Sequence, residues 1–374
     1  MNVDRRTVLV GAAATLAAAP ALAAKPKRYP AWYSNAIVID GLGGISDPYG
    51  PDMELRLTDR AWAESRMTGL TAVRDTLLPV GNSADSWEQF QKNLTDYHNS
   101  LLANPERLKL VEKASDIIVC KRDEKLGIIL GTQDTAMVGP ALDRLAEMKK
   151  AGVRCVQLTY NLRNLSGDGS IEPGNAGLSN LGRMTIERIE TEKLLLDLAH
   201  GGARTIEEAI AYAKRPLTIS HTGARALYDH PRNVSDVAIR GVAEKGGVVG
   251  VYFMPYLAAN MHPAGATLLD NIDHVANVAG EDHVSIGTDG GVLPLLIDAK
   301  ARENAKKDYE QRKAAGIAAP GEGPDVFTVV EDYNSIDKLE RLATDLMKRG
   351  WTTTQVEKLL GRNLLRLYGE VWGG

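Results

Sequence analysis

Two histidines end successive apolar runs of this sequence, and their placement suggests a metal site. His200 closes "KLLLDLAH" (193–200) and His221 closes "RPLTISH" (215–221), and each is followed by a turn that contains glycine. Asp289 stands near the end of a later run, "HVSIGTDGG" (283–291). Neutral imidazoles with a carboxylate are donors that suit zinc or a similar divalent ion. Such an ion would acidify a bound water, and Asp289 would take its proton.

Each of these residues also has a purely structural interpretation. Either histidine alone is consistent with a strand-end residue bonded to a backbone carbonyl, and Asp289 alone with a cap of the turn "TDGG". The pairing of His200 with His221 favours the metal interpretation. The remaining histidines and two early aspartates lie in contexts that favour structural roles. They are His98, His230, His262, His274, His283, Asp40 and Asp75.

Arg232, in "DHPRNVSD", follows His221 within the same loop and is a candidate for substrate binding. A guanidinium can hold a carboxylate through two parallel hydrogen bonds. A surface arginine before a helix start would have the same spacing, so the sequence pattern alone leaves both interpretations open.

Eight short, nearly continuous apolar runs alternate with helical patterns, which is typical of parallel strands covered by helices. The fold class is therefore expected to be α/β, a (β/α)8 TIM barrel. Because loops at the carboxyl ends of the strands converge on the barrel mouth, the residues named above should meet there. The runs span 36–41, 70–76, 126–134, 153–160, 193–200, 215–221, 246–253 and 283–291.

The barrel is expected to be one domain over 25–374. A helical crossover is predicted between about 81 and 113, and an insertion over about 292–335, rich in Ala, Lys, Gly and Pro, should cross the mouth. The C-terminal stretch "TTTQVEKLLGRNLLRLYGEVW" predicts helices that close the barrel. Only two cysteines occur, Cys120 and Cys155, which excludes a disulfide framework but leaves one bridge open.

Residues 1–24 are interpreted as a signal peptide of the twin-arginine type. Arg5 and Arg6 precede a weakly apolar stretch that ends in Ala21-Leu22-Ala23, a small-residue cleavage pattern. A membrane anchor or an amphipathic helix is the alternative, but the stretch is short for a span. Export to the periplasm without a stable membrane span is therefore expected. The net charge of −4 shows no excess of basic residues of the kind that binds nucleic acid, so nucleic acid is not expected as a partner.

Several of these motifs together resemble the membrane (renal) dipeptidase family, peptidase family M19, a branch of the amidohydrolase-type metal-dependent barrels. They are "LAHGGARTIEEAI", "RPLTISHTGARALYDHPRNVSD", "GGVVGVYF", "IDHVANVAGEDHVSIGTDGG" and "LLGRNLLRLY", and the similarity runs from about Ile37 to Tyr368. The resemblance implies a two-zinc dipeptidase. It places His200 and His221 as ligands of the second metal, Arg232 on the substrate carboxylate, and Asp289 as the catalytic aspartate.

Four polar positions of that family pattern are changed in this chain. The first run reads "IDGLGGIS", so Leu42 and Gly44 stand where the family has the His and Asp of the first metal. Gln133 replaces a bridging glutamate and remains only a weak candidate ligand, while Tyr160 replaces the catalytic histidine. The changes favour one zinc ion over two, with Asp134 or Tyr160 as a further donor.

The sequence thus predicts a periplasmic hydrolase of small dipeptide-like amides with a reduced metal site. The alternative is a metal-free barrel that binds a carboxylate-bearing ligand without catalysis. Hydrolysis of an ester or lactone is a third hypothesis, because a fold alone does not fix the chemistry. The sequence is also compatible with a homo-oligomer.

Overall fold

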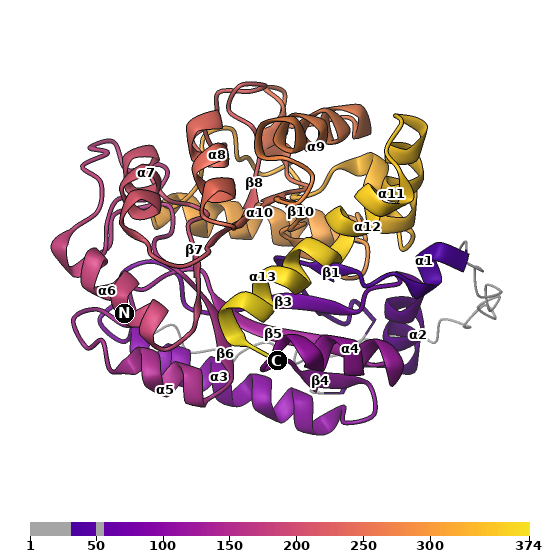
Figure 1. Cartoon of the computed structure of the whole chain (residues 1–374), viewed down its shortest axis with the longest axis horizontal. Coiled ribbons are helices and arrows are strands. Elements are labelled where there is room, and N and C mark those ends of the chain that lie inside the picture. The colour runs from indigo at the N-terminus through magenta and orange to yellow at the C-terminus, as the bar shows by residue number, and fades with distance from the viewer. Residues whose placement is uncertain (1–30, 50–55) are drawn as a thin grey trace.

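The computed structural model describes residues 31–49 and 56–374. Eight parallel strands run in the order β1-β3-β5-β6-β7-β8-β9-β10, with helices around them (Figure 1). Each lies in one of the eight apolar runs or extends at most one residue beyond it, so the predicted barrel is confirmed. The strands are β1 (Ile39–Asp40), β3 (Ala72–Leu77), β5 (Leu126–Thr132), β6 (Val153–Gln157), β7 (Leu195–Asp197), β8 (Thr218–Thr222), β9 (Val248–Val251) and β10 (Val284–Ile286).

Helices cover the outside of the barrel and one of its ends. On the outer face they are α1 (Ala31–Asn35), α2 (Asp59–Met67), α3 (Ser86–Ala103), α4 (Ala114–Arg122), α5 (Arg144–Lys150), α6 (Asn180–Thr191), α7 (Ala203–Tyr212), α8 (Asp236–Glu244), α9 (Gly265–Ala279) and α11 (Lys338–Lys348). The C-terminal elements are α12 (Thr353–Glu357), the π-helical segment η3 (Lys358–Arg362) and α13 (Asn363–Trp372).

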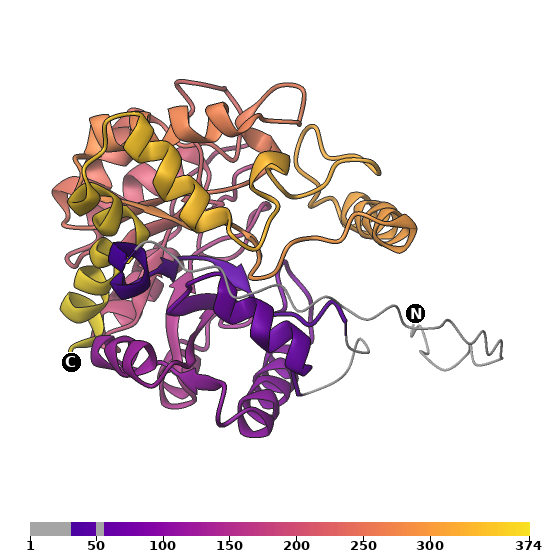
Figure 2. The same ribbon diagram turned by 90° about the vertical axis from the view of Figure 1, so that its right-hand side faces the viewer.

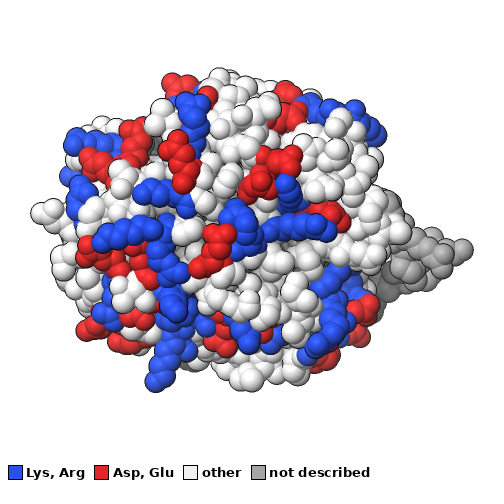
Figure 3. All heavy atoms as spheres, viewed as in Figure 1, with Lys and Arg blue, Asp and Glu red and all other residues white. Residues whose placement is uncertain are grey.

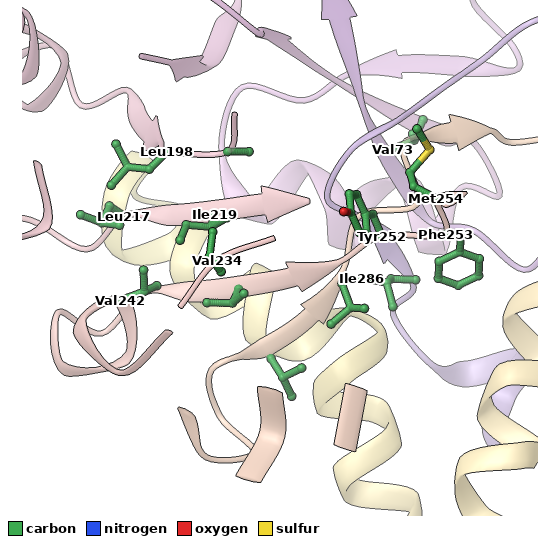
Figure 4. Packing of buried hydrophobic residues seen from close by; sticks show 14 of the residues in the cluster. Val73, Leu198, Leu217, Ile219, Val234, Val242, Tyr252, Phe253, Met254 and Ile286 are labelled. Atoms are coloured by element: carbon green, nitrogen blue, oxygen red, sulfur yellow. The ribbon is translucent and has the colours of Figure 1, made fainter. Parts of the chain in front are cut away.

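The apolar runs form strands because both of their faces are buried. On the outer side, Ile219 of β8, Ile286 of β10 and Val242 of α8 belong to one fully buried cluster, part of which Figure 4 shows. At the end opposite the mouth, α13 packs Leu364 and Leu367 against inward-facing strand residues. The predicted closing helix is therefore present and supplies the floor of the barrel.

The barrel closes between its first and last strands through a short extra ladder at the mouth. β2 (Gly43–Gly44) pairs in parallel with β11 (Gly290–Gly291), and the Asp289 amide donates to the Leu42 carbonyl at 2.8 Å. A Cβ built on Gly43 would lie 2.7 Å from an Asp40 carboxylate oxygen, so glycine fits there and a larger residue would not. The end of the first strand is thereby sealed against the eighth.

The predicted crossover and insertion are both present, with one element that the sequence pattern missed. The crossover contains α3 and also a three-residue strand, β4 (Leu108–Leu110), which pairs with β5 and is too short to give a periodic signal. The insertion carries α10 (Ala299–Ala314) and the short 3-10 turn η2 (Glu331–Tyr333), and a second such turn, η1 (Pro255–Leu257), follows β9. Figure 2 shows α10, in orange, on the side opposite the yellow C-terminal helices.

Both cysteines are free and buried, so the disulfide left open by the sequence does not form. Burial raises the pKa of Cys120 to about 11 and that of Cys155 to about 12. Basic and acidic side chains are interspersed on the face shown in Figure 3. Within the part of the chain that the structure describes, no helix has the length and apolar character needed to cross a bilayer. The predicted signal peptide lies outside the described residues.

Candidate active site

The structure brings His200 and His221 together at the barrel mouth. His221 belongs to β8, and His200 follows β7 in a left-handed backbone conformation with φ of 60°. Their ring centroids are 4.9 Å apart, and both side chains are buried. Adjacent strands therefore deliver both imidazoles to one place, as expected from their positions at the ends of two runs.

Hydrogen bonds fix the tautomer of His221. The Ser220 hydroxyl donates to an Asp197 carboxylate oxygen at 2.6 Å, so its oxygen lone pair faces His221 Nδ1 at 2.8 Å. The imidazole must therefore carry its proton on Nδ1 and donate it to Ser220. Asp197 is itself held by Arg74 in a fully buried ion pair inside the barrel. The Nε2 atom is left with a free lone pair.

His200 is oriented in the same sense by a different neighbour. Asn161 donates its amide nitrogen to the Ile317 carbonyl at 2.7 Å, which turns its oxygen toward His200 Nδ1 at 2.6 Å. The proton of His200 therefore also sits on Nδ1. Burial, and next the positive charge of Arg232, hold the pKa of both histidines well below its usual value. Both rings are neutral at physiological pH and present unprotonated Nε2 atoms.

The two Nε2 atoms are buried and accept no hydrogen bond from any described residue. Unpaired buried polar atoms are uncommon in folded proteins, because leaving one unsatisfied costs about 1–3 kcal/mol. A divalent cation would use both lone pairs. This donor set fits one half of a metal site, with the second ring nitrogen of each histidine held by a hydrogen-bond partner, as is usual for metal ligands.

Asp289 places a carboxylate close to the Nε2 atom of His221. Its Oδ2 lies 4.0 Å from His221 Nε2, and its backbone adopts a φ of 56° just beyond β10. Burial raises the pKa of Asp289 to about 6, against the lowering influence of Arg232 and Arg312. In residues 31–49 and 56–374, no three His, Cys, Asp or Glu side chains are already grouped at metal-binding spacing. The site therefore offers donors for one ion without a closed coordination set.

At the two positions where the family pattern has the His and Asp of the first metal, this chain has no side chain that can bind a metal ion. Leu42 is buried, with its backbone engaged by Asp289, and Gly44 lies in the β2–β11 ladder. Gln133 turns its amide nitrogen to Thr76 Oγ1 at 3.1 Å. Its amide oxygen makes no hydrogen bond to a described residue, so Gln133 stays a weak candidate ligand.

Asp134, predicted as a possible further metal donor, uses its carboxylate for hydrogen bonds within the fold. Its Oδ1 accepts from the Thr135 amide at 2.8 Å and from Asn164 at 2.7 Å, and its Oδ2 accepts from the Gly81 amide at 2.8 Å. Both carboxylate oxygens are therefore committed to fixing the loop after β5.

Arg232 is buried, so the surface-arginine interpretation is wrong. Only 2% of it is exposed, and its Nη2 atom has no hydrogen-bond partner among the described residues. No carboxylate within the described ranges lies at ion-pair distance from it. A buried guanidinium without a carboxylate bonded to it is costly, which makes it a ready site for an anionic ligand.

His200, Arg232 and Asp289 line one cavity of about 430 Å³ at the mouth, and His221 is fully buried beside His200. The floor of the cavity contains Tyr160, Asn161, His200, Arg232 and Asp289. One face of α10 forms its roof and contributes Ala301, Asn304, Ala305, Asp308, Tyr309 and Arg312. The insertion therefore does cross the mouth, and it encloses a space large enough for a small ligand.

Three functional candidates are not predicted from the sequence, namely Tyr256, Arg312 and Glu322, and Asn161 is placed at the end of a strand without a role. Asn161 follows Tyr160 at the end of the fourth run, so its position gave a signal, but its partner Ile317 is far away in sequence. Arg312 and Glu322 lie in a polar insertion whose residues look alike to any periodicity argument. Only the folded chain shows which of them turn inward.

The residues expected to be structural make structural bonds. Asp40 accepts from the Thr288 amide at 2.8 Å, and Asp75 from the Ile45 amide at 2.9 Å. Among the remaining histidines, His98, His230 and His283 contact backbone carbonyls. His274 pairs with Asp236 at 2.8 Å.

Comparisons with known proteins agree with this geometry. The family model described as membrane dipeptidase, peptidase family M19, matches residues 61–300, more than half of the chain. The chain is 26% identical over 271 residues to the dipeptidase tcpJ of Claviceps purpurea. That alignment covers 71% of this chain but only 56% of the fungal protein.

Solved structures are similar over nearly the whole chain. A crystal structure of an amidohydrolase from Pseudomonas aeruginosa is 27% identical with a TM-score of 0.78, covering 92% of this chain and 98% of that one. A metallopeptidase from Rhodobacter sphaeroides, liganded with a phosphinate mimic of the dipeptide L-Ala-D-Ala, shares the fold at 18% identity. Its TM-score is 0.70, with 90% and 100% of the two chains covered.

Proposed function

We propose, from the premise that this chain belongs to the membrane dipeptidase family, peptidase family M19, that it hydrolyses small dipeptide-like amides with a single divalent metal ion. His200 and His221 would hold the ion through Nε2, with Asp289 beside it, and zinc is the metal that best suits this mixed donor set. A bound zinc ion lowers the pKa of a water so that it is nucleophilic near neutral pH.

The observation that carries the proposal is the pair of unsatisfied Nε2 atoms. Both imidazoles are buried and neutral, and each has its proton held on Nδ1 by a separate hydrogen-bond partner. A histidine as fully buried as these, with a purely structural role, would be expected to satisfy both nitrogens within the fold. Two neighbouring rings prepared in the same way support metal binding more strongly than either does alone.

Arg232 and Asp289 support the substrate class and the acid–base role. Arg232 is a buried cation that opens onto the cavity, and a free carboxylate at the end of a dipeptide would neutralise it. Because burial raises the pKa of Asp289 only to about 6, this carboxylate is mostly ionised at pH 7. It can therefore accept a proton from the attacking water.

The alternative is a metal-free barrel that binds a carboxylate-bearing ligand without catalysis. It is favoured by the sealed first-metal position, where Leu42 is buried and β2 pairs with β11. In this alternative, Arg232 still binds the ligand carboxylate, and His200 and His221 have no functional role.

A panel of L,L and L,D dipeptides separates the two. The chelated protein and the zinc-loaded protein are each assayed for release of free amino acids, with His221→Ala as the matched metal-site variant. We expect turnover only in the zinc-loaded wild type. Turnover after chelation would contradict the metal requirement, and ligand binding without turnover under any metal would favour the binder.

Export to the periplasm is a further proposal, and its support is the twin-arginine pattern at Arg5 and Arg6. Cell fractionation of the wild type and of a variant with both arginines changed to lysine tests it. Equal distribution of the two proteins would contradict it.

A further inference from the structure

The hydroxyl of Tyr160 occupies a fixed place in the cavity. Its ring stacks on the His200 ring with centroids 4.2 Å apart and an interplanar angle of 22°. Tyr160 follows β6, is 8% exposed and lines the cavity. The ring therefore covers one face of the histidine that would hold the metal, and its hydroxyl reaches the same space as the substrate.

Arg312 of α10 contacts this hydroxyl from the roof of the cavity. Its Nη1 donates to Tyr160 Oη at 3.2 Å. Its other side makes a two-point bond to Glu322, with Nε to Oε2 and Nη2 to Oε1 both at 2.9 Å. Glu322 also accepts from the Tyr256 hydroxyl at 2.6 Å and from the Ala319 amide at 2.9 Å. Arg312 is therefore held in place and is already neutralised.

The rest of the insertion is tied to the barrel in the same region. The Ile317 carbonyl accepts from Asn161 at 2.7 Å, and the Pro320 carbonyl contacts His230 Nε2 at 2.9 Å. Both partners lie on loops that follow barrel strands. The position of Arg312 thus results from several bonds between the insertion and the mouth.

The direction of the Arg312 bond determines what Tyr160 can do. A guanidinium has no acceptor, so the tyrosine oxygen must accept and its own proton points elsewhere. No described residue takes that proton in a hydrogen bond. One face of the ring is blocked by His200, and the cavity is open beyond the hydroxyl.

We propose that Arg312 is a positioning residue that aims the Tyr160 hydroxyl as a hydrogen-bond donor at the oxygen of the scissile amide. When water adds to the amide carbon, the C=O π-electron pair moves onto that oxygen and one water proton passes to Asp289. Collapse then breaks the C–N bond, and the proton goes to the departing amine. Tyr160 keeps its proton throughout and stabilises the negative oxygen, a role that rests on the proposed function.

The test measures the affinity of a phosphinate pseudodipeptide by calorimetry in zinc-loaded protein. Its tetrahedral anion resembles the intermediate, and its binding does not require turnover. Tyr160→Phe and Arg312→Gln are each expected to weaken binding about tenfold or more, while the double variant is no weaker than Tyr160→Phe by more than about threefold. Arg312→Lys, which keeps a donor, should recover part of the loss.

Lys307→Gln is the matched control, because it removes a cation paired with Glu303 on the exposed side of α10. It should stay within about twofold of the wild type, as expected of an exposed position. Glu322→Gln provides a second route, since it loosens Arg312 without altering it. It should weaken binding in the wild type and have no further effect in the Tyr160→Phe background.

Additive losses in the double variant, or an Arg312→Gln effect no larger than that of the control, would overturn the inference. So would a wild type that fails to bind the phosphinate. Dipeptide turnover tests the proposed function separately. If the affinities follow the expected pattern but no dipeptide is hydrolysed, the inferred role of Arg312 and Tyr160 stands and the proposed hydrolase function is refuted. If dipeptides are hydrolysed but the affinities do not follow the pattern, only the inferred role of Arg312 and Tyr160 is refuted.

Discussion

Replacing Arg232 with lysine tests the carboxylate site without assuming a metal. The backbone of Arg232 is held independently of its side chain, because its amide donates to His230 Nδ1 at 3.2 Å and its carbonyl accepts from the Thr222 hydroxyl at 2.9 Å. The substitution should therefore leave the loop in place. Lysine keeps the positive charge but loses the planar, two-point donor.

The magnitude follows from the buried setting of this side chain. Only 2% of Arg232 is exposed, so solvent screens little of its interaction with a ligand. Hydrogen bonds to charged groups contribute about 1.5–3 kcal/mol, and each 1.4 kcal/mol is about a factor of ten in affinity. We expect Arg232→Lys to lower kcat/KM, or binding, by about tenfold to a hundredfold for ligands with a free carboxylate.

The assay compares a dipeptide with its C-terminal amide in the wild type and in Arg232→Lys. The amidated ligand has no carboxylate for Arg232 to bind. Its kcat/KM or Kd should therefore differ by less than about twofold between Arg232→Lys and the wild type. Arg240→Lys, at an exposed position of α8, is the control and should affect neither ligand. Equal losses for the two ligands would refute the carboxylate clamp, and so would an Arg232→Lys effect as small as that of the control.

Three further predictions concern the surroundings of the site. Arg74→Met leaves Asp197 as an unpaired charge inside the barrel and should lower the free energy of unfolding by about 3–5 kcal/mol in urea titrations; a loss below about 1 kcal/mol would contradict this. Because burial raises the pKa of Asp289 from 3.8 to about 6, the folded state disfavours its ionised form. The stability of the metal-free protein should therefore fall as pH rises through this interval and stay low above it, and Asp289→Asn should abolish the fall measured by urea midpoints; an unchanged pH slope in the variant would count against it. Asn161→Leu frees the Nδ1 proton of His200 and should weaken zinc binding about ten- to a hundredfold in a chelator competition, whereas unchanged affinity would show that the amide does not orient the ring.

The barrel was predictable because its signal is local. Each apolar run is buried on both faces in the structure, and the ends of these runs bring His200, His221 and Asp289 to the mouth by the geometry of the fold alone. The family resemblance added roles for these residues. It also marked Leu42 and Gly44 as changed, although it could not show that β2 and β11 close the barrel there.

The roof of the site was not predictable in detail. The insertion over 292–335 was expected to cross the mouth, but α10 has no buried residue and hence no periodic pattern that distinguishes its inner face. Arg312 reaches Tyr160, 152 positions away in the sequence, because Glu322 fixes its guanidinium and because the Ile317 carbonyl accepts from Asn161, 156 positions away. Contacts of this kind depend on the folded arrangement and leave no trace in residue spacing.

The zinc content of the purified chain tests the central claim most directly. Protein dialysed against zinc and freed of excess metal by gel filtration is submitted to elemental analysis, with His200→Ala and His221→Ala as blanks. One zinc ion per chain in the wild type, and only a trace in both variants, is the predicted result. Two ions per chain would contradict the reduced site, and no zinc above the level of the variants would contradict the metal-dependent hydrolase itself.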